Sequence, residues 1–138
     1  MNGRFSFWIL AAGILGATGI GLSAWTSHGL PQYVTDVHAL QIAEARAQSA
    51  NLNLLLHAVL LFAIGVWRRS GAGWFAALAG ALILLGMALF SGGMYLLYIF
   101  NDMSSSPMTR LVPVGGFSVI AGWLCLSVSA WSNSSCTD

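Results

Sequence analysis

The sequence predicts an all-α protein: a bundle of four transmembrane helices with a long first extramembrane connection that contains a helix. Of its 138 residues, 57% are hydrophobic and only 7% are charged, and lysine is absent. A soluble domain carries about 25% charged residues because its surface faces water. In addition, four apolar segments approach the length of about 20 residues that a helix needs to cross the hydrocarbon core. We therefore expect membrane lipids to surround most of the chain.

The four segments give the expected spans in chain order. They extend from about Phe5 to Trp25, Leu52 to Trp67, Trp74 to Phe100 and Leu111 to Trp131. The first also has features of a cleaved signal peptide, but its apolar run is longer than a signal core, which favours a retained span. Six tryptophans fall mostly near segment ends, as interfacial indoles do: Trp8, Trp25, Trp67, Trp74, Trp123 and Trp131. We expect one transmembrane domain over residues 1–131 and a polar, disordered tail over residues 132–138.

The connection from His28 to Asn51 contains good helix formers after Asp36 and no glycine or proline there. Thr35 or Asp36 is a suitable N-cap for a helix that starts at this point. We expect this helix to lie near the membrane surface or to continue directly into the second span.

Arginine positions predict the orientation. Arg4, Arg68 and Arg69 lie on one side of the four-span arrangement, and Arg46 and Arg110 lie on the other. The positive-inside rule then places both termini in the cytoplasm.

Small residues predict how the helices pack, because helices in lipid associate through close approach rather than through hydrophobicity. The first span repeats a small residue every four positions, and the third and fourth contain similar runs, including Gly73, Ala77 and Ala81 with Ala76 and Gly80 beside them. The second span is rich in leucine and phenylalanine, which predicts more lipid-facing or knob-like surface. The expected packing residues are Gly13, Ala17, Gly21, Gly92, Gly115, Gly116 and Gly122.

The notable polar side chains are expected in one leaflet, at the end of the bundle that carries the first connection. These candidate structural or ligand-binding residues are His28, Asn53, His57, Ser91, Tyr95 and Arg110. An ionisable residue inside a span is a functional candidate. A neutral imidazole is also a plausible structural clamp if Ser91 or Tyr95 bonds to it, and this reading of His57 is favoured. A haem held by His28 and His57 is a minority alternative.

The sequence contains no recognisable hydrolase, nucleotide-binding or metal-binding pattern. Its acidic residues, Asp36, Glu44, Asp102 and Asp138, lie outside the expected spans. We therefore expect no catalytic residues, no metal and no cofactor. A net charge of +1 gives no reason to expect a nucleic-acid partner. Cys125 lies in an apolar run and Cys136 in the polar tail, so a disulfide between them is not expected.

Four stretches resemble the landmarks of one family: "SHGL" at residues 27–30, "LLLHAVLLF" at 54–62, "LFSGGMYLL" at 89–97 and "VPVGGFSVIAGW" at 112–123. The family is domain of unknown function 423, also called the UPF-0382 or TMEM-256-like family of small bacterial inner-membrane proteins. The resemblance covers about Phe5 to Trp131. It implies four spans and no established enzymatic activity.

The chain departs from the family pattern next to both histidines. Thr26 and Ser27 stand where a Gly-Ala pair is usual, and Leu54 and Leu56 replace a usual glutamine and aromatic residue. The resemblance thus implies a specialised member that lacks a polar partner near His57.

The favoured function is a non-catalytic accessory or structural subunit that packs against a larger membrane complex, for example in a respiratory chain. A small oligomeric transporter or channel is one alternative. A haem- or quinone-binding subunit that uses the histidine and tyrosine cluster is the other.

Overall fold

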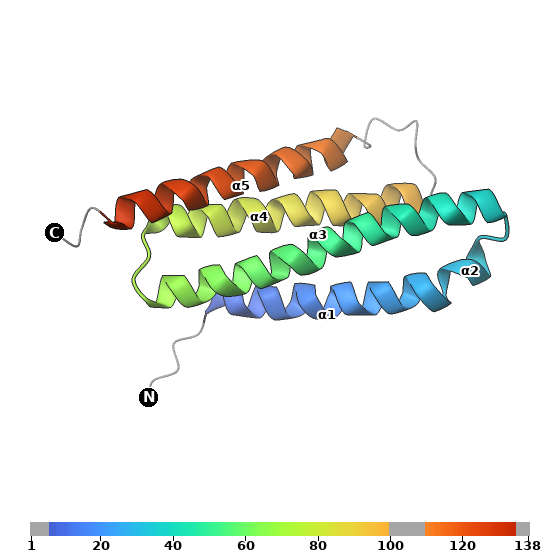
Figure 1. Ribbon diagram of the computed structural model, residues 1–138, viewed down its shortest axis with the longest axis horizontal. Coiled ribbons are helices and arrows are strands. Elements are labelled where there is room, and N and C mark those ends of the chain that lie inside the picture. Colours follow the sequence, from blue (N-terminus) through green and yellow to red (C-terminus); the bar gives the residue numbers. More distant parts are fainter. Residues whose placement is uncertain (1–5, 100–109, 135–138) are drawn as a thin grey trace.

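The computed structural model describes residues 6–99 and 110–134 of the chain. Its helices, in chain order, are α1 (Phe7–His28), α2 (Leu30–Tyr33), α3 (Val37–Arg69), α4 (Trp74–Gly93), the π-helix η1 (Met94–Ile99) and α5 (Leu111–Ser134). α1, α3, α4 with η1, and α5 form an elongated antiparallel bundle (Figure 1). Four of these helical segments are long and apolar enough to cross a membrane, which confirms the predicted fold class.

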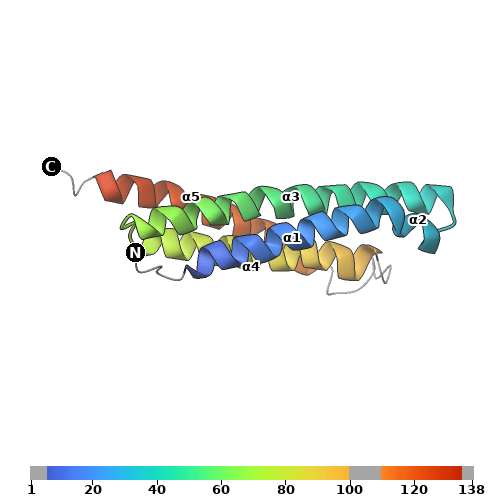
Figure 2. The same ribbon diagram turned by 90° about the horizontal axis from the view of Figure 1, so that it is seen from below.

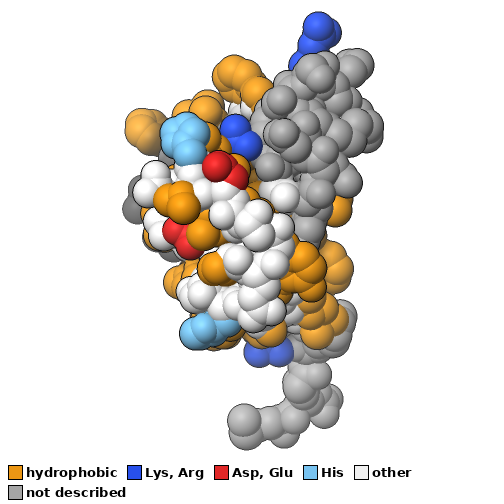
Figure 3. Space-filling view, turned by 90° about the vertical axis from the view of Figure 1, so that its right-hand side faces the viewer, with side chains coloured by type: hydrophobic (Ala, Val, Ile, Leu, Met, Phe, Trp, Pro, Cys, Tyr) orange, Lys and Arg blue, Asp and Glu red, His pale blue; other side chains and the backbone are white. Residues whose placement is uncertain are grey.

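The two ends of the bundle differ. α2 lies at one end, called here the α2 end, whereas α1 begins and α5 finishes at the opposite end (Figure 1). Seen from the α2 end, the surface carries acidic, basic and histidine side chains among other polar groups (Figure 3). This end therefore exposes charged and other polar side chains beyond the apolar spans.

α3 joins the predicted connecting helix and the second span in one continuous helix of 33 residues. Asp36 is its N-cap, and its Oδ1 accepts a hydrogen bond from the backbone N–H of Ala39 at 2.7 Å. At about 1.5 Å per residue α3 is about 50 Å long, whereas the hydrocarbon core is about 30 Å thick. Its first turns accordingly extend past the end of α4 (Figure 2).

α3 is also the central helix. Of its most apolar window, 44% is buried inside the protein, against 17% for α1 and 17% for α5. Exposed residues such as Leu52, Leu56 and Val59 give this leucine-rich span lipid-facing surface. Its other side packs as the knob-like alternative predicts, because Leu54, Leu61 and Ile64 form the core with Ile83 and Met87 of α4 and with Ala12 of α1.

α4 and α5 approach closely enough for their backbones to touch. A Cβ added at Gly115 would lie 2.6 Å from the backbone nitrogen of Phe90, and one at Gly86 would lie 2.7 Å from the carbonyl oxygen of Gly115. Gly122 lies one heptad further along, against Ile83 and Ala79. Glycine is needed at these positions because any side chain would separate the two helices.

The α1 stripe of Gly13, Ala17 and Gly21 faces away from the bundle. All three residues are exposed, and a Cβ at either glycine would meet no atom within 4 Å. Gly19 makes the close contact instead, because a Cβ there would lie 2.8 Å from Leu55. Four-residue spacing alone does not reveal which side of a helix faces its neighbours.

Three other packing expectations need the same correction. In the first two turns of α4 the buried residues are Ala76, Ala79 and Gly80, so the expected neighbours Ala76 and Gly80 are buried rather than the run of Gly73, Ala77 and Ala81. Gly92 and Gly116 also have open space around their Cβ positions. Each forms a double glycine with a neighbour, Gly93 or Gly115, that does pack.

The turn between α3 and α4 is closed by its own arginine. Gly71 has a φ of 100°, a left-handed conformation that favours glycine. Arg68 Nη1 donates to the carbonyl oxygens of Ala72 and Gly73.

At its C-terminal end, α5 continues to Ser134, past the start of the expected tail. Several predictions fall on residues outside the described ranges: Arg4, Phe5, Phe100, Asp102, Cys136 and Asp138.

We expect Gly115→Ala to lower the free energy of unfolding by about 1–3 kcal/mol, because the added methyl group must push α4 and α5 apart. Gly116→Ala is the matched control, since its Cβ meets no atom within 4 Å. Denaturant unfolding of both variants in the same detergent measures the difference. Equal destabilisation of the two would contradict the close approach of these helices.

Candidate functional site: polar contacts between the helices

Near the α2 end, the tyrosine site (Tyr95, Asn51 and Thr26) joins three helices. The Tyr95 hydroxyl donates to Asn51 Oδ1 at 2.9 Å, and both residues are buried. The hydroxyl oxygens of Thr26 and Tyr95 lie 3.4 Å apart. Thus η1, α3 and α1 meet at one polar point inside the apolar bundle.

The hydroxyl protons indicate which contact of this site matters most. Tyr95 has one hydroxyl proton, and its short bond to Asn51 uses it. Thr26 also has one, and its Oγ1 donates to the Leu22 carbonyl at 2.8 Å. Neither hydroxyl has a second proton to donate across the 3.4 Å contact between Tyr95 and Thr26. The hydrogen bond between Tyr95 and Asn51 is therefore the main polar contact of this site.

Tyr95 lies in the π-helix at the end of α4. A π-helix has wider turns than an α-helix and changes the direction of the side chains that follow it. Such segments are frequent at functional sites. Here the preceding α-helical residue Ser91 and the π-helical residue Tyr95 both bond to α3, since Ser91 Oγ donates to the Ala50 carbonyl at 3.0 Å.

The histidine site (His57 and Trp123) lies between α3 and α5. Trp123 Nε1–H donates to His57 Nε2 at 3.2 Å, and His57 Nδ1 lies 2.8 Å from the Asn53 carbonyl oxygen. An indole N–H can only donate, so Nε2 is the acceptor and Nδ1 carries the proton. The neutral imidazole is thereby satisfied at both nitrogens, although it is buried.

The histidine site lies near the middle of the bundle rather than at its α2 end. Gly122 packs on Ile83, and Ile83 is close to the middle of the span from Trp74 to Leu96. Trp123, the next residue, is therefore far from the interface where it was expected. His57 bonds to neither Ser91 nor Tyr95, contrary to our expectation, because it lies about 9 Å further along α3 than Asn51.

The depth of Trp123 explains why it needs His57. Trp123 is 45% exposed on the outer surface of α5. In hydrocarbon an unpaired N–H is costly because no water is available as an acceptor. His57 supplies that acceptor across the interface between α3 and α5.

The two histidines are too far apart to bind one haem. Gly65 packs on Ile9 and Gly19 packs on Leu55, so the α1 residue level with His57 is close to Ala17. His28 lies 11 residues further along α1, about 16 Å away along its axis, and is exposed. The outer cluster predicted from His28, His57, Asn53, Ser91, Tyr95 and Arg110 is thus several separate groups.

The remaining candidates have local roles or face outward. Asn53 Nδ2 donates to the Ser49 carbonyl within its own helix at 3.0 Å, and Arg110 is exposed beside the first turn of α5. Within residues 6–99 and 110–134, no three histidine, cysteine or acidic residues lie close enough together to hold a metal ion.

The sequence reasoning omitted Asn51, Thr26 and Trp123 from its candidate list. Asn51 and His57 share the buried side of α3 with Ala47, Ala50 and Leu54, and this periodicity was available in the sequence. The partnership between His57 and Trp123 had no local signal, because it depends on the register of α5.

Comparison with known proteins agrees with the predicted resemblance. The family model "Protein of unknown function (DUF423)" matches residues 22–116. A UPF0382 membrane protein of Schizosaccharomyces pombe is 30% identical over 126 residues, which cover 89% of this chain and 99% of that protein. The chain belongs to this family. No solved structure gives a significant match.

A second relative is the UPF0382 membrane protein YwdK of Bacillus subtilis. It is 31% identical over 124 residues, which cover 88% of this chain and 94% of YwdK. Both relatives are named as membrane proteins, as the four apolar helices require. Because one comes from a eukaryote, the family is not confined to the bacterial inner membrane that the resemblance suggested.

We expect Tyr95→Phe to destabilise this DUF423 protein by about 1 kcal/mol, because Asn51 Oδ1 loses its donor. Thr26→Val is the comparison, and we expect it to cost less than about 0.5 kcal/mol because the Thr26 proton is used within α1. Unfolding in detergent measures both. A larger loss from Thr26→Val would contradict our assignment of the protons.

We expect Trp123→Phe and His57→Leu to be energetically coupled by about 0.6 kcal/mol, the average for bonds between transmembrane helices. A double-mutant cycle measures this coupling. Trp131→Phe, about 12 Å further along the same helix, is the control and should be additive with His57→Leu. Additivity in both cycles would show that the indole bond contributes nothing.

Proposed function

We propose that the protein is a non-catalytic accessory or structural subunit that packs against a larger membrane protein complex. The exposed small-residue side of α1, which contains Gly13, Ala17 and Gly21, is the observation that carries this proposal. Small residues at four-residue spacing let a second helix approach closely in lipid. Within the protein itself, Gly86 and Gly115 allow that kind of approach between α4 and α5.

The interior of the bundle supports a structural role. The buried side chains Ser91, Tyr95 and His57 are engaged in bonds between or within helices, which stabilise the fold. Between the tyrosine site and the opposite end, the core is mostly apolar, with residues such as Leu61, Ile64 and Ile83, and its buried polar side chains there are His57 and Ser129. A channel would need polar groups at all depths, so the arrangement favours a subunit over a pore.

We also propose that both termini face the cytoplasm. Arg68 and Arg69 support this orientation, because they follow the second span at the end opposite α2. In this orientation the polar α2 end faces the outer side of the membrane. Respiratory-chain complexes are the class of partner to examine first, since accessory subunits of this size and apolarity suit such assemblies.

Purification from native membranes in a mild detergent tests the proposal. We expect the tagged wild-type chain to co-purify with a defined membrane complex, and the Gly13→Leu/Gly21→Leu double variant to lose it because the side chains block helix approach. Gly116→Leu is the control, since its position on α5 is also open. A wild-type chain that always migrates alone would contradict the proposed role.

A further inference from the structure

The short turn between α3 and α4 holds an arginine side chain in place at the end of the bundle opposite α2. Arg68 Nη1 donates to the carbonyl oxygens of Ala72 and Gly73, the second at 2.8 Å. The Arg68 side chain is half-buried, whereas its neighbour Arg69 is exposed. Because the protein already orders the Arg68 guanidinium, a ligand that binds it loses little affinity to side-chain ordering.

The bonds to these carbonyls leave one edge of the Arg68 guanidinium open. Within residues 6–99 and 110–134, its Nε and Nη2 make no hydrogen bond. These two nitrogens carry parallel N–H groups, which is the arrangement that binds two oxygens of one phosphate or carboxylate. Gly71 is exposed, and a Cβ there would meet no atom within 4 Å, so the surface of the turn is not covered by another helix.

The charge of Arg68 is not balanced by a carboxylate in the described part of the chain. The acidic residues there are Asp36 and Glu44, which both lie near the start of α3. At about 1.5 Å per residue, Glu44 is about 36 Å from Arg68 along the helix. That distance is several times the Debye length of about 8 Å in physiological salt. The open edge of Arg68 therefore suits an anion that comes from outside these segments.

Exposed tryptophans indicate which anion lies at this level of the bundle. Trp74, directly after the turn, is 64% exposed and stacks on Phe75 with 4.0 Å between the ring centroids. Gly122 packs on Ala79, so in the antiparallel α5 the later residue Trp131 is level with the turn. Exposed indoles gather at the membrane–water interface, at the level of the lipid headgroups. The phosphate group of a phospholipid is the anion concentrated at that depth.

We propose that the turn between α3 and α4 binds the phosphate of an anionic phospholipid through Nε and Nη2 of Arg68, with Trp74 beside the glycerol and the first part of the acyl chains. Arg69 adds a second positive charge, which favours a headgroup with net negative charge over a zwitterionic one. The proposal is independent of the accessory role, because it does not involve the exposed side of α1. It holds in either orientation, since both leaflets contain phosphate groups.

Lipid titration of the delipidated full chain in detergent, followed by native mass spectrometry, tests the proposal. Phosphatidylglycerol and phosphatidylcholine with the same acyl chains are the probes, and we expect the first to bind more tightly. Arg68→Lys keeps the charge but loses the planar fork, so it should weaken phosphatidylglycerol binding at least about threefold. Arg69→Lys and Arg110→Lys are the matched controls and should each change binding less than about twofold.

A second measurement uses the wild-type chain and does not depend on how well a variant folds. Phenylglyoxal modifies accessible arginine side chains, and mass spectrometry of peptides reports the rate at each position. We expect phosphatidylglycerol to slow modification of Arg68 at least about threefold, because a lipid bound for most of the time covers the guanidinium. Arg110, at the α2 end, should react at the same rate with and without the lipid.

Three results would overturn the proposal. Equal binding of the two lipids, with equal modification rates at Arg68, would show that no anionic headgroup is selected. Unchanged phosphatidylglycerol binding in Arg68→Lys would show that charge alone attracts the lipid and that no bidentate site exists. Displacement of the lipid by millimolar glycerol 3-phosphate would instead identify a site for a soluble phosphate compound.

Discussion

The backbone contact between α4 and α5 is the constraint on which the arrangement of polar groups in α5 depends. Gly86 and Gly115 touch through their backbones, and Gly122 repeats the contact one heptad later. This register brings Ser118 Oγ within 2.8 Å of the Leu82 carbonyl and the Trp123 indole within 3.2 Å of His57. Neither bond could form if a side chain on Gly115 displaced α5. In lipid, where no hydrophobic force draws helices together, such contacts determine position.

The polar bonds then connect the two closely packed pairs of helices. α1 packs on α3 and α4 packs on α5, and each pair has its own glycine contacts. The tyrosine site and Ser91 join α3 to the α4–η1 segment, and the histidine site joins α3 to α5. Each bond is worth about 0.6 kcal/mol on average in a membrane bundle. These hydrogen bonds fix the axial register between neighbouring helices, because apolar packing alone would allow one helix to shift along another.

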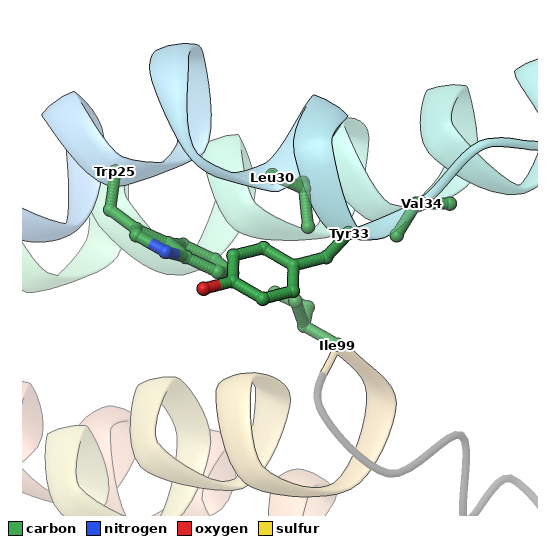
Figure 4. A pocket seen from close by; sticks show the side chains of 5 residues that line it. All are labelled: Trp25, Leu30, Tyr33, Val34 and Ile99. Atoms are coloured by element: carbon green, nitrogen blue, oxygen red, sulfur yellow. The ribbon is translucent and has the colours of Figure 1, made fainter.

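The α2 end combines features that the rest of the bundle lacks. α3 extends past the end of α4 there, η1 continues α4 as a π-helix, and Thr26 places a hydroxyl beside Tyr95. A cavity lined by Trp25, Leu30, Tyr33, Val34 and Ile99 opens at the same end (Figure 4). The opposite end is closed by a short turn that Arg68 holds.

The sequence by itself determined the helices, because composition, apolar length and the Asp36 cap are local properties. It determined four spans and the family, and it left a continuous α3 as one of two alternatives. It did not determine which side of each helix is buried, because α1 and α4 have small residues on more than one side and only a neighbour's shape selects between them: Gly19 packs whereas Gly13 does not. Nor did it determine the partners of His57. The hydrogen bond between His57 and Trp123 joins residues that are 66 positions apart in the sequence, so it depends on the axial register of α5. The backbone contact between α5 and α4 at their glycines sets that register.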